Sequence, residues 1–119
     1  MDISQKIAEL KKIPGFAEQV GMILVHNGVV RGWSRQDGRN VTQLRVNPDY
    51  ERIEAIRLEF EQRPGIFKVL VEAREGVFAP GDDLLFIVVA GDVRENVAPA
   101  LSEALNRVKQ EAMHKEEIS

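Results

Sequence analysis

The sequence contains no cysteine and only two histidines, His26 and His114. Without cysteine, the chain can have no disulfide bond, no thiolate metal site and no cysteine nucleophile. The lack of cysteine also fits a reducing compartment. The two histidines lie far apart in the sequence, and no cysteine is available to join them at a metal ion. We therefore expect neither a bound metal nor a cofactor.

Long apolar segments and an excess of positive charge are also missing. The longest apolar run, residues 84–91, is far shorter than the roughly 20 residues that a membrane-spanning helix needs. Residues such as Asp2 and Lys6 make the start of the chain too polar for a signal peptide. Lys plus Arg number 16 against 19 for Asp plus Glu, whereas a nucleic-acid-binding protein normally has a positive excess. We expect a soluble, cytoplasmic protein that binds neither membrane nor nucleic acid.

The pattern of apolar residues predicts three helices and four strands. The chain should open with a short helix that ends at the Pro14-Gly15 turn. A second helix is expected after Asn47 as its N-cap, with Pro48 at the first helical position, and a third opens at Asp92 in a capping box. The four strands are expected at residues 20–26, which should be buried on both faces, and at residues 41–46, 66–73 and 82–90.

Three segments have no predicted helix or strand. Residues 32–40 form a loop around Trp33, which is either an anchor packed on the core or a contact for a partner. Residues 74–81 should be a loop that closes on a Pro-Gly turn, and the charged residues 111–119 should fray. The order α-β-β-α-β-β-α predicts one α+β domain over residues 1–119, with a mixed or antiparallel sheet and the helices packed on one of its faces.

Cationic residues at the ends of elements are the candidates for chemistry, since no Gly-x-Ser-x-Gly, P-loop or His-Glu-x-x-His motif is present. Arg31 directly follows the first strand. Arg94, beside the free N–H groups that open the last helix, is either an anion-binding residue or a solvated surface residue. Lys109 borders the apolar face of that helix and is either an acid–base group with a lowered pKa or a rim lysine. Lys115 follows near the end of the chain.

Several motifs, taken in order, resemble those of the large, catalytic subunit of molybdopterin synthase. Gly28-Val29-Val30-Arg31 matches the Gly-x-Val-Arg motif with which the first strand of that family ends. A strand-to-helix segment follows at residues 44–60. Arg74-Glu75-Gly76 and Gly81-Asp82 then match an Arg-x-Gly-x-x-x-x-Gly-acidic stretch. The resemblance covers roughly residues 3–115.

Three cationic residues continue the match. Arg94 lies where the family has an arginine at the head of its long helix, and Lys109 and Lys115 lie where it has two lysines. Several features differ from the family pattern. The Pro-x-Trp segment before the second lysine is missing, and the interval from Lys109 to Lys115 is one residue shorter. The histidine that precedes the helix arginine is Val93 here, and the aromatic residue two positions before the motif glycine is His26.

The resemblance implies a transferase of molybdenum cofactor biosynthesis with an α/β hammerhead type of fold. The family converts cyclic pyranopterin monophosphate into molybdopterin, with sulfur from the C-terminal Gly-Gly thiocarboxylate of a small ubiquitin-like subunit. The resemblance also implies a heterotetramer, in which a central homodimer of this chain binds one small subunit at each end. By position, Arg31 and Arg94 bind the substrate. Lys109 transfers a proton or holds the partner's tail covalently, and Lys115 stabilises the developing anion or the tail carboxyl group.

Two other interpretations stay open from the sequence. The same fold could bind a ubiquitin-like partner or a pterin without catalysis, or the chain could be an unrelated α+β domain that dimerises through sheet edges. Arg94 and Lys109 lie roughly 22 Å apart along one helix at about 1.5 Å per residue, too far for one small ligand. We therefore expect either an elongated pocket or, as the preferred arrangement, a site that combines Arg94 of one protomer with Lys109 of another.

Overall fold

The computed structural model describes residues 2–119, which form an elongated α+β fold of 49 × 25 × 24 Å. The helices are α1 (Ile3–Lys11), α2 (Phe16–Gln19), α3 (Tyr50–Glu61) and α4 (Arg94–Glu111). The strands are β1 (Met22–Val29), β2 (Gln43–Pro48), β3 (Ile66–Ala73), β4 (Gly76–Phe78), β5 (Asp83–Gly91) and β6 (Met113–Ile118). Among residues 2–119, no helix has both the length and the apolar character that crossing a membrane requires.

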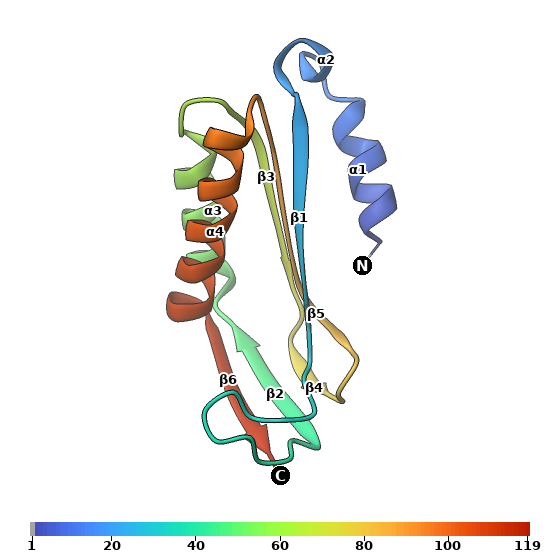
Figure 1. The fold of residues 1–119 in the computed structure, drawn as a ribbon, viewed down its shortest axis with the longest axis vertical. Helices are drawn as coiled ribbons and strands as arrows, with labels where there is room; N and C mark the ends of the chain where they lie inside the picture. Colours follow the sequence, from blue (N-terminus) through green and yellow to red (C-terminus); the bar gives the residue numbers. More distant parts are fainter. Residues whose placement is uncertain (1) are drawn as a thin grey trace.

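Two antiparallel sheets of three strands each lie end to end along the molecule (Figure 1). The long sheet has the order β1-β5-β3, and the short sheet has the order β4-β2-β6. Strand β5 is the centre of the long sheet, and all but its first residue are buried, because its apolar run Leu84–Gly91 is covered on both faces. The strands predicted at residues 66–73 and 82–90 are therefore confirmed, the second within one residue.

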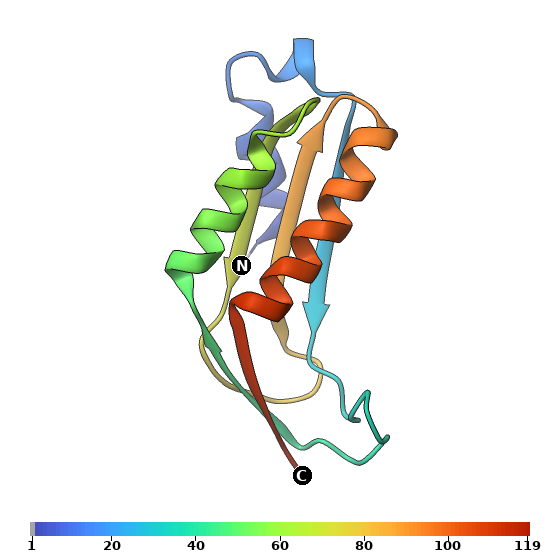
Figure 2. The ribbon, with the colours of Figure 1, turned by 90° about the vertical axis from the view of Figure 1, so that its left-hand side faces the viewer.

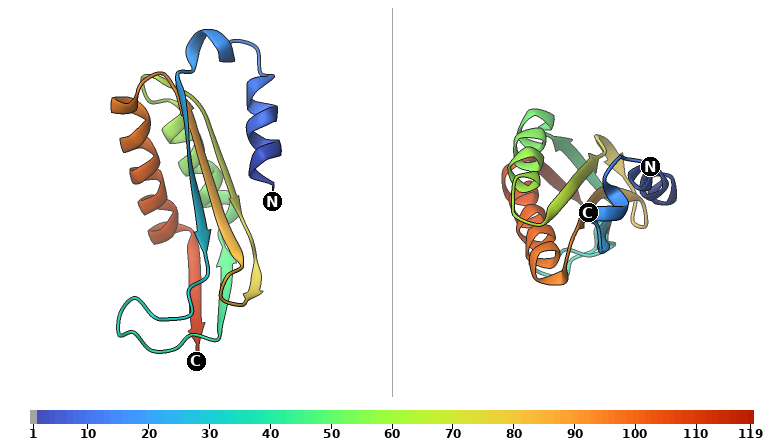
Figure 3. Two further views of the ribbon diagram at one scale, coloured as in Figure 1. Left: turned by 45° about the vertical axis from the view of Figure 1, so that its right-hand side comes forward. Right: turned by 90° about the horizontal axis from the view of Figure 1, so that it is seen from above.

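The helices cover both faces of the long sheet, so the predicted packing on one face is wrong. Helices α3 and α4 lie side by side on one face (Figure 2), and α1 lies on the other (Figure 3). The alternation of β5 explains this arrangement. Ile87 and Val89 belong to the core beneath α3 and α4, whereas Val88 and Ala90 pack with Leu10 of α1.

Strand β1 is not buried on both faces as predicted. It begins at Met22, and its Val25 and Val29 side chains are 37% and 47% exposed. Strand β1 lies at the edge of the long sheet. On the face of the sheet opposite α3 and α4, helix α1 covers only one end (Figure 3). An apolar run alone does not distinguish a central strand from such an edge strand.

Strands β4 and β6 occupy segments that were predicted as a loop and a frayed tail. Both pair with β2, on its two sides, so that Val46 lies opposite Gly76 in β4 and opposite Lys115 in β6. Both segments are strands because their backbones form hydrogen bonds with β2, although each is distant from β2 in the sequence. Their own sequences have too little apolar alternation to predict a strand.

The predicted N-caps of two helices are each displaced. Asn47 and Pro48 continue β2, because β6 pairs with them, and Asp49 caps α3 by accepting a hydrogen bond from the Arg52 N–H at 3.0 Å. Asp92 is held in the preceding turn, where its N–H donates to the Gly65 carbonyl at 2.9 Å. Helix α4 therefore begins one residue later, with Val93 as an N-cap that has no side-chain hydrogen bond.

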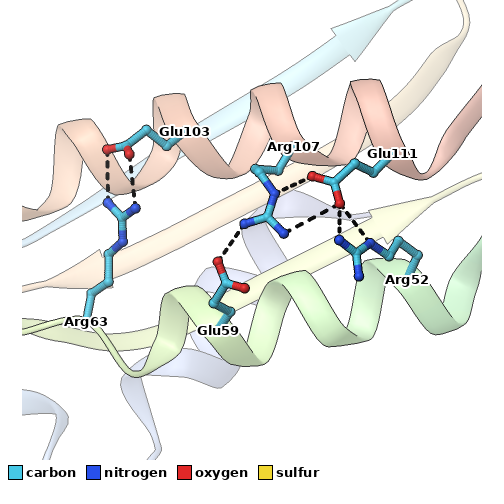
Figure 4. A network of polar contacts seen from close by, with 6 residues as sticks. All are labelled: Arg52, Glu59, Arg63, Glu103, Arg107 and Glu111. Atoms are coloured by element: carbon cyan, nitrogen blue, oxygen red, sulfur yellow. Dashed lines mark hydrogen bonds and ion pairs between the residues drawn. The ribbon is translucent and has the colours of Figure 1, made fainter.

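Ion pairs join α3 to the last turns of α4 (Figure 4). Glu111 accepts hydrogen bonds from Arg107 and Arg52, and Arg107 also bonds to Glu59. Hydrogen bonds from Arg107 and then Arg52 lower the pKa of Glu111 to about 2. The network holds the end of α4 against α3, and β6 leaves from this end.

Candidate functional site

A cavity of about 660 Å³ lies where α4 ends and β6 begins. Its walls come from β1, the loop at residues 30–42, β2, β5, α4 and β6, which meet at the same end of the long sheet (Figure 1). The charged side chains in its lining are Arg31, Arg35, Lys109, Lys115 and Glu117. Segments from both halves of the chain therefore build one strongly cationic hollow.

Arg31 is positioned by the turn through which the chain leaves β1. Val30 is buried, its N–H donates to the Asp82 carbonyl at 2.9 Å, and its carbonyl accepts from the Gly81 N–H at the same distance. The Arg31 guanidinium then lies 4.9 Å from the centre of the Trp33 ring. Trp33 is 52% exposed, so it is not a core anchor; it supports Arg31 by a cation–π contact.

Lys109 and Lys115 reach the cavity from either side of the α4–β6 junction. Val108 and Ala112 are fully buried and fix the last turn of α4, which places Lys109 at the cavity. Lys115 lies on β6 opposite Val46 of β2. The residues expected to fray are thus an ordered strand that contributes a lysine to the site.

The pKa of each lysine is lowered in the folded protein. Burial lowers the pKa of Lys109, and the positive charges of Arg31 and Arg35 lower it further. Burial likewise lowers the pKa of Lys115, with added repulsion from Lys109 and Arg31, while Glu117 partly opposes the shift. Ammonium groups in such surroundings give up a proton more readily than exposed lysines and are stabilised by a bound anion.

The arrangement suits an anionic ligand that carries phosphate or carboxylate groups. Four cationic side chains and one carboxylate, Glu117, line the cavity. Guanidinium groups such as those of Arg31 and Arg35 match the oxygens of phosphate and carboxylate. A lysine with a lowered pKa can transfer protons beside the ligand. The arrangement therefore suits both anion binding and acid–base chemistry.

Three of the four predicted site residues lie at this cavity, and Arg94 does not. Arg94 opens α4 at the end opposite Lys109, and its side chain is 82% exposed with only a 4.0 Å contact to Glu95. The alternative of an elongated pocket within one chain is not found, because the cavity lining does not include Arg94. The preferred arrangement, a site that combines Arg94 of one protomer with Lys109 of another, stays a prediction.

Two cavity residues, Arg35 and His26, were not among the sequence candidates. Arg35 belongs to the polar loop, and nothing in the sequence pattern distinguishes it from Arg39 as a candidate site residue. His26 lies inside an apolar strand, and the signal that could have found it is its replacement of an aromatic residue in the resembled family. Its side chain lines the cavity beside both lysines.

Known proteins resemble this chain in sequence and in fold. The family model described as "MoaE protein" matches residues 1–111. The chain is 27% identical over 112 residues to a "Probable molybdopterin synthase" of Haloferax volcanii. That match covers 90% of this chain but 42% of the relative, so the chain spans less than half of the relative's length.

Two solved structures share the fold. A molybdopterin synthase from Staphylococcus aureus has a TM-score of 0.79 at 22% identity, over 99% of this chain and 85% of that chain. The second is a complex of subunits 1 and 2 of molybdopterin-converting factor from Helicobacter pylori. It has a TM-score of 0.70 at 16% identity, over 98% of this chain and 78% of that chain.

Proposed function

The chain belongs to the MoaE protein family, and we propose that it is the catalytic large subunit of a molybdopterin synthase. The proposed reaction converts cyclic pyranopterin monophosphate into molybdopterin, with sulfur from the thiocarboxylated C-terminus of a ubiquitin-like small subunit. The observation that carries this proposal is the meeting of Arg31, Lys109 and Lys115 at one cavity. Both the pterin phosphate and the thiocarboxylate are anions, and this cavity is rich in positive charge.

Each cationic group has a role that its surroundings support. Arg31, held by Trp33, binds phosphate oxygens of the substrate. Lys115 stabilises negative charge that develops during sulfur transfer or on the partner's tail. Lys109, with its lowered pKa, donates and accepts the protons of the reaction or holds the tail covalently.

The small subunit is a proposed partner of this chain. Its Gly-Gly tail ends in a thiocarboxylate, and a cationic hollow at the end of the long sheet attracts such a group. The Helicobacter pylori structure that shares this fold is named as a complex of subunits 1 and 2, which supports a two-component assembly. A cytoplasmic location remains a prediction, which cell fractionation would test.

Arg94 enters the proposal through a second protomer. Its position at the far end of α4 keeps it from the cavity of its own chain. A homodimer in which Arg94 of one protomer approaches the Lys109 cavity of the other brings the two groups together. The site would then be complete only in the dimer, with a small subunit at each end.

Reconstitution tests the proposed function. Purified chain is incubated with a thiocarboxylated small subunit and cyclic pyranopterin monophosphate, and the dithiolene product is measured. Formation of molybdopterin, and none with a small subunit that ends in an ordinary carboxylate, is the expected result. Binding of the small subunit or the pterin without product would instead support the second interpretation, a catalytically idle relative.

A further inference from the structure

His26 faces the cavity because of its place on β1. It pairs across the long sheet with Ile87 of β5. Met22 and Leu24, on the same strand face, pack against the core beneath α3 and α4, so the alternation of the strand directs His26 to the α4 side. Gly28 follows on this face, and a Cβ atom there would lie 3.1 Å from His26 Nε2. The glycine leaves the space that the imidazole occupies.

The Nε2 atom of His26 is buried and has no hydrogen-bond partner within residues 2–119. Buried polar side-chain atoms are nearly always hydrogen-bonded, because an unpaired one has lost its contact with water and gained nothing in return. The imidazole lines the cationic cavity. A ligand in that cavity can supply the missing partner.

The charged groups around His26 come from three elements: Lys109 on α4, Lys115 and Glu117 on β6, and Arg31 and Arg35 on the loop after β1. Burial lowers the pKa of His26, and repulsion from Lys109 and Lys115 lowers it further. Both effects favour the neutral form of the ring. An anion bound among these cations reverses the local balance and favours the protonated ring.

We propose that His26 is an additional anion-binding residue of this cavity, which takes up a proton from solvent when the ligand binds and donates a hydrogen bond from Nε2 to a phosphate oxygen of the ligand. The inference rests on the proposed function, since it takes the same cavity to hold the substrate phosphate. Atoms balance simply: one proton leaves solvent and stays on the ring while the ligand is bound. Binding therefore strengthens as the pH falls.

Inorganic sulfate is a suitable probe, because it is tetrahedral like phosphate and keeps its charge between about pH 5 and 8, where histidine changes its own. The chain has only two histidines, so ring-proton NMR can follow each of them. His114, exposed on β6, provides a reference in the same sample. Two variants complete the set: His26→Phe keeps a flat ring without titrating, and His26→Gln keeps a neutral hydrogen-bonding group.

Sulfate should raise the titration midpoint of His26. The affinity of the wild type for sulfate should increase by up to about tenfold for each pH unit of fall between the free and bound midpoints. Both variants should lose this part of the pH dependence, and circular dichroism should show that each is folded. Because His26→Gln can still donate a hydrogen bond, it separates proton uptake from hydrogen bonding alone.

Three results would overturn the inference: no binding of sulfate to the wild type, an unchanged His26 midpoint at saturation, or the same pH dependence in His26→Phe. The proposed function is judged separately. Proton uptake at His26 without molybdopterin in the reconstitution would refute the synthase and leave this role intact. Molybdopterin formation with an unchanged His26 titration midpoint would support the synthase and refute the role of His26.

Discussion

The proposed catalytic role of Lys109 can be tested separately from a stabilising one. Burial lowers the pKa of Lys109, and nearby positive charges lower it further, so the charged form gains little from folding. Lys109→Ala should lower molybdopterin formation by on the order of 10²–10⁴-fold, the contribution typical of general acid–base catalysis. Its melting temperature should stay close to that of the wild type.

A matched control for this substitution is Lys12→Ala, at an exposed lysine that caps the C-terminal end of α1 and does not line the cavity. It should change neither activity nor melting temperature. Wild-type rates in Lys109→Ala would exclude Lys109 from the chemistry. A large fall in the melting temperature of Lys109→Ala would show that Lys109 stabilises the fold instead.

At the residue scale, sequence reasoning found the cations that a local pattern marks. Arg31 ends a recognisable motif, and Lys109 borders an apolar helix face. His26 and Arg35 could not be found in this way. Their importance comes from the meeting of β1, the following loop and the end of α4, which is a matter of long-range packing. Arg94 is a different case. Its position at the start of the last helix was predicted correctly, but that position does not determine which cavity its side chain reaches.

Ion pairs between α3 and α4 should make a pH-dependent contribution to the stability of the protein. The pKa of Glu111 falls from 4.5 to about 2 because Arg107 and Arg52 donate hydrogen bonds to it. A carboxylate with a depressed folded-state pKa stabilises the protein fully above the unfolded value of 4.5, and this contribution disappears as the pH falls to about 2. Glu111→Gln should lower the urea midpoint at neutral pH, and the difference from the wild type should shrink progressively below pH 4.5.

Glu9→Gln is the control for this prediction, since Glu9 is an exposed residue of α1 with no ion pair within the described part of the chain. Glu9→Gln should leave the urea midpoint nearly unchanged both at neutral pH and below pH 4.5. Equal midpoints for Glu111→Gln and the wild type at neutral pH would mean that the network contributes nothing measurable. Exposed ion pairs often behave in that way, so networks such as this one need the direct measurement.

At the element scale, the longer helices and the apolar strands were predictable because their pattern of apolar residues is local. Residues 66–73 form β3 as expected, and the core run forms β5. Strand β6 was not predictable, because its residues Met113–Ile118 are mostly polar and exposed. Hydrogen bonds to β2, more than 60 positions earlier, make it a strand. The same pairing turned the predicted cap Asn47 into a strand residue.

On the scale of the whole molecule, we expect a homodimer. The resemblance implies one, and β1 leaves an edge of the long sheet with exposed Val25 and Val29 beside it. Light scattering at micromolar concentration should give twice the mass of one chain. A monomer at these concentrations would remove the shared site, since Arg94 could not then approach a cavity.

Arg94→Ala should mainly weaken substrate binding, by the roughly 1.5–3 kcal/mol typical of a hydrogen bond to a charged group. Its exposed side chain makes no contact on which the fold depends, so its melting temperature should not change. Measured by calorimetry with cyclic pyranopterin monophosphate, an affinity equal to that of the wild type would exclude Arg94 from substrate binding.

Mixing Arg94→Ala with Lys109→Ala tests most directly that catalysis occurs in the cationic cavity completed by a second protomer. A heterodimer of the two variants contains one site with both residues intact and one site that lacks both. At a substrate concentration too low to saturate the Arg94→Ala variant, it should therefore regain part of the molybdopterin formation that each homodimer has lost, up to half of the wild-type rate per dimer. Verified heterodimers that stay as inactive as their parents, while all species remain folded and dimeric, would contradict this assignment.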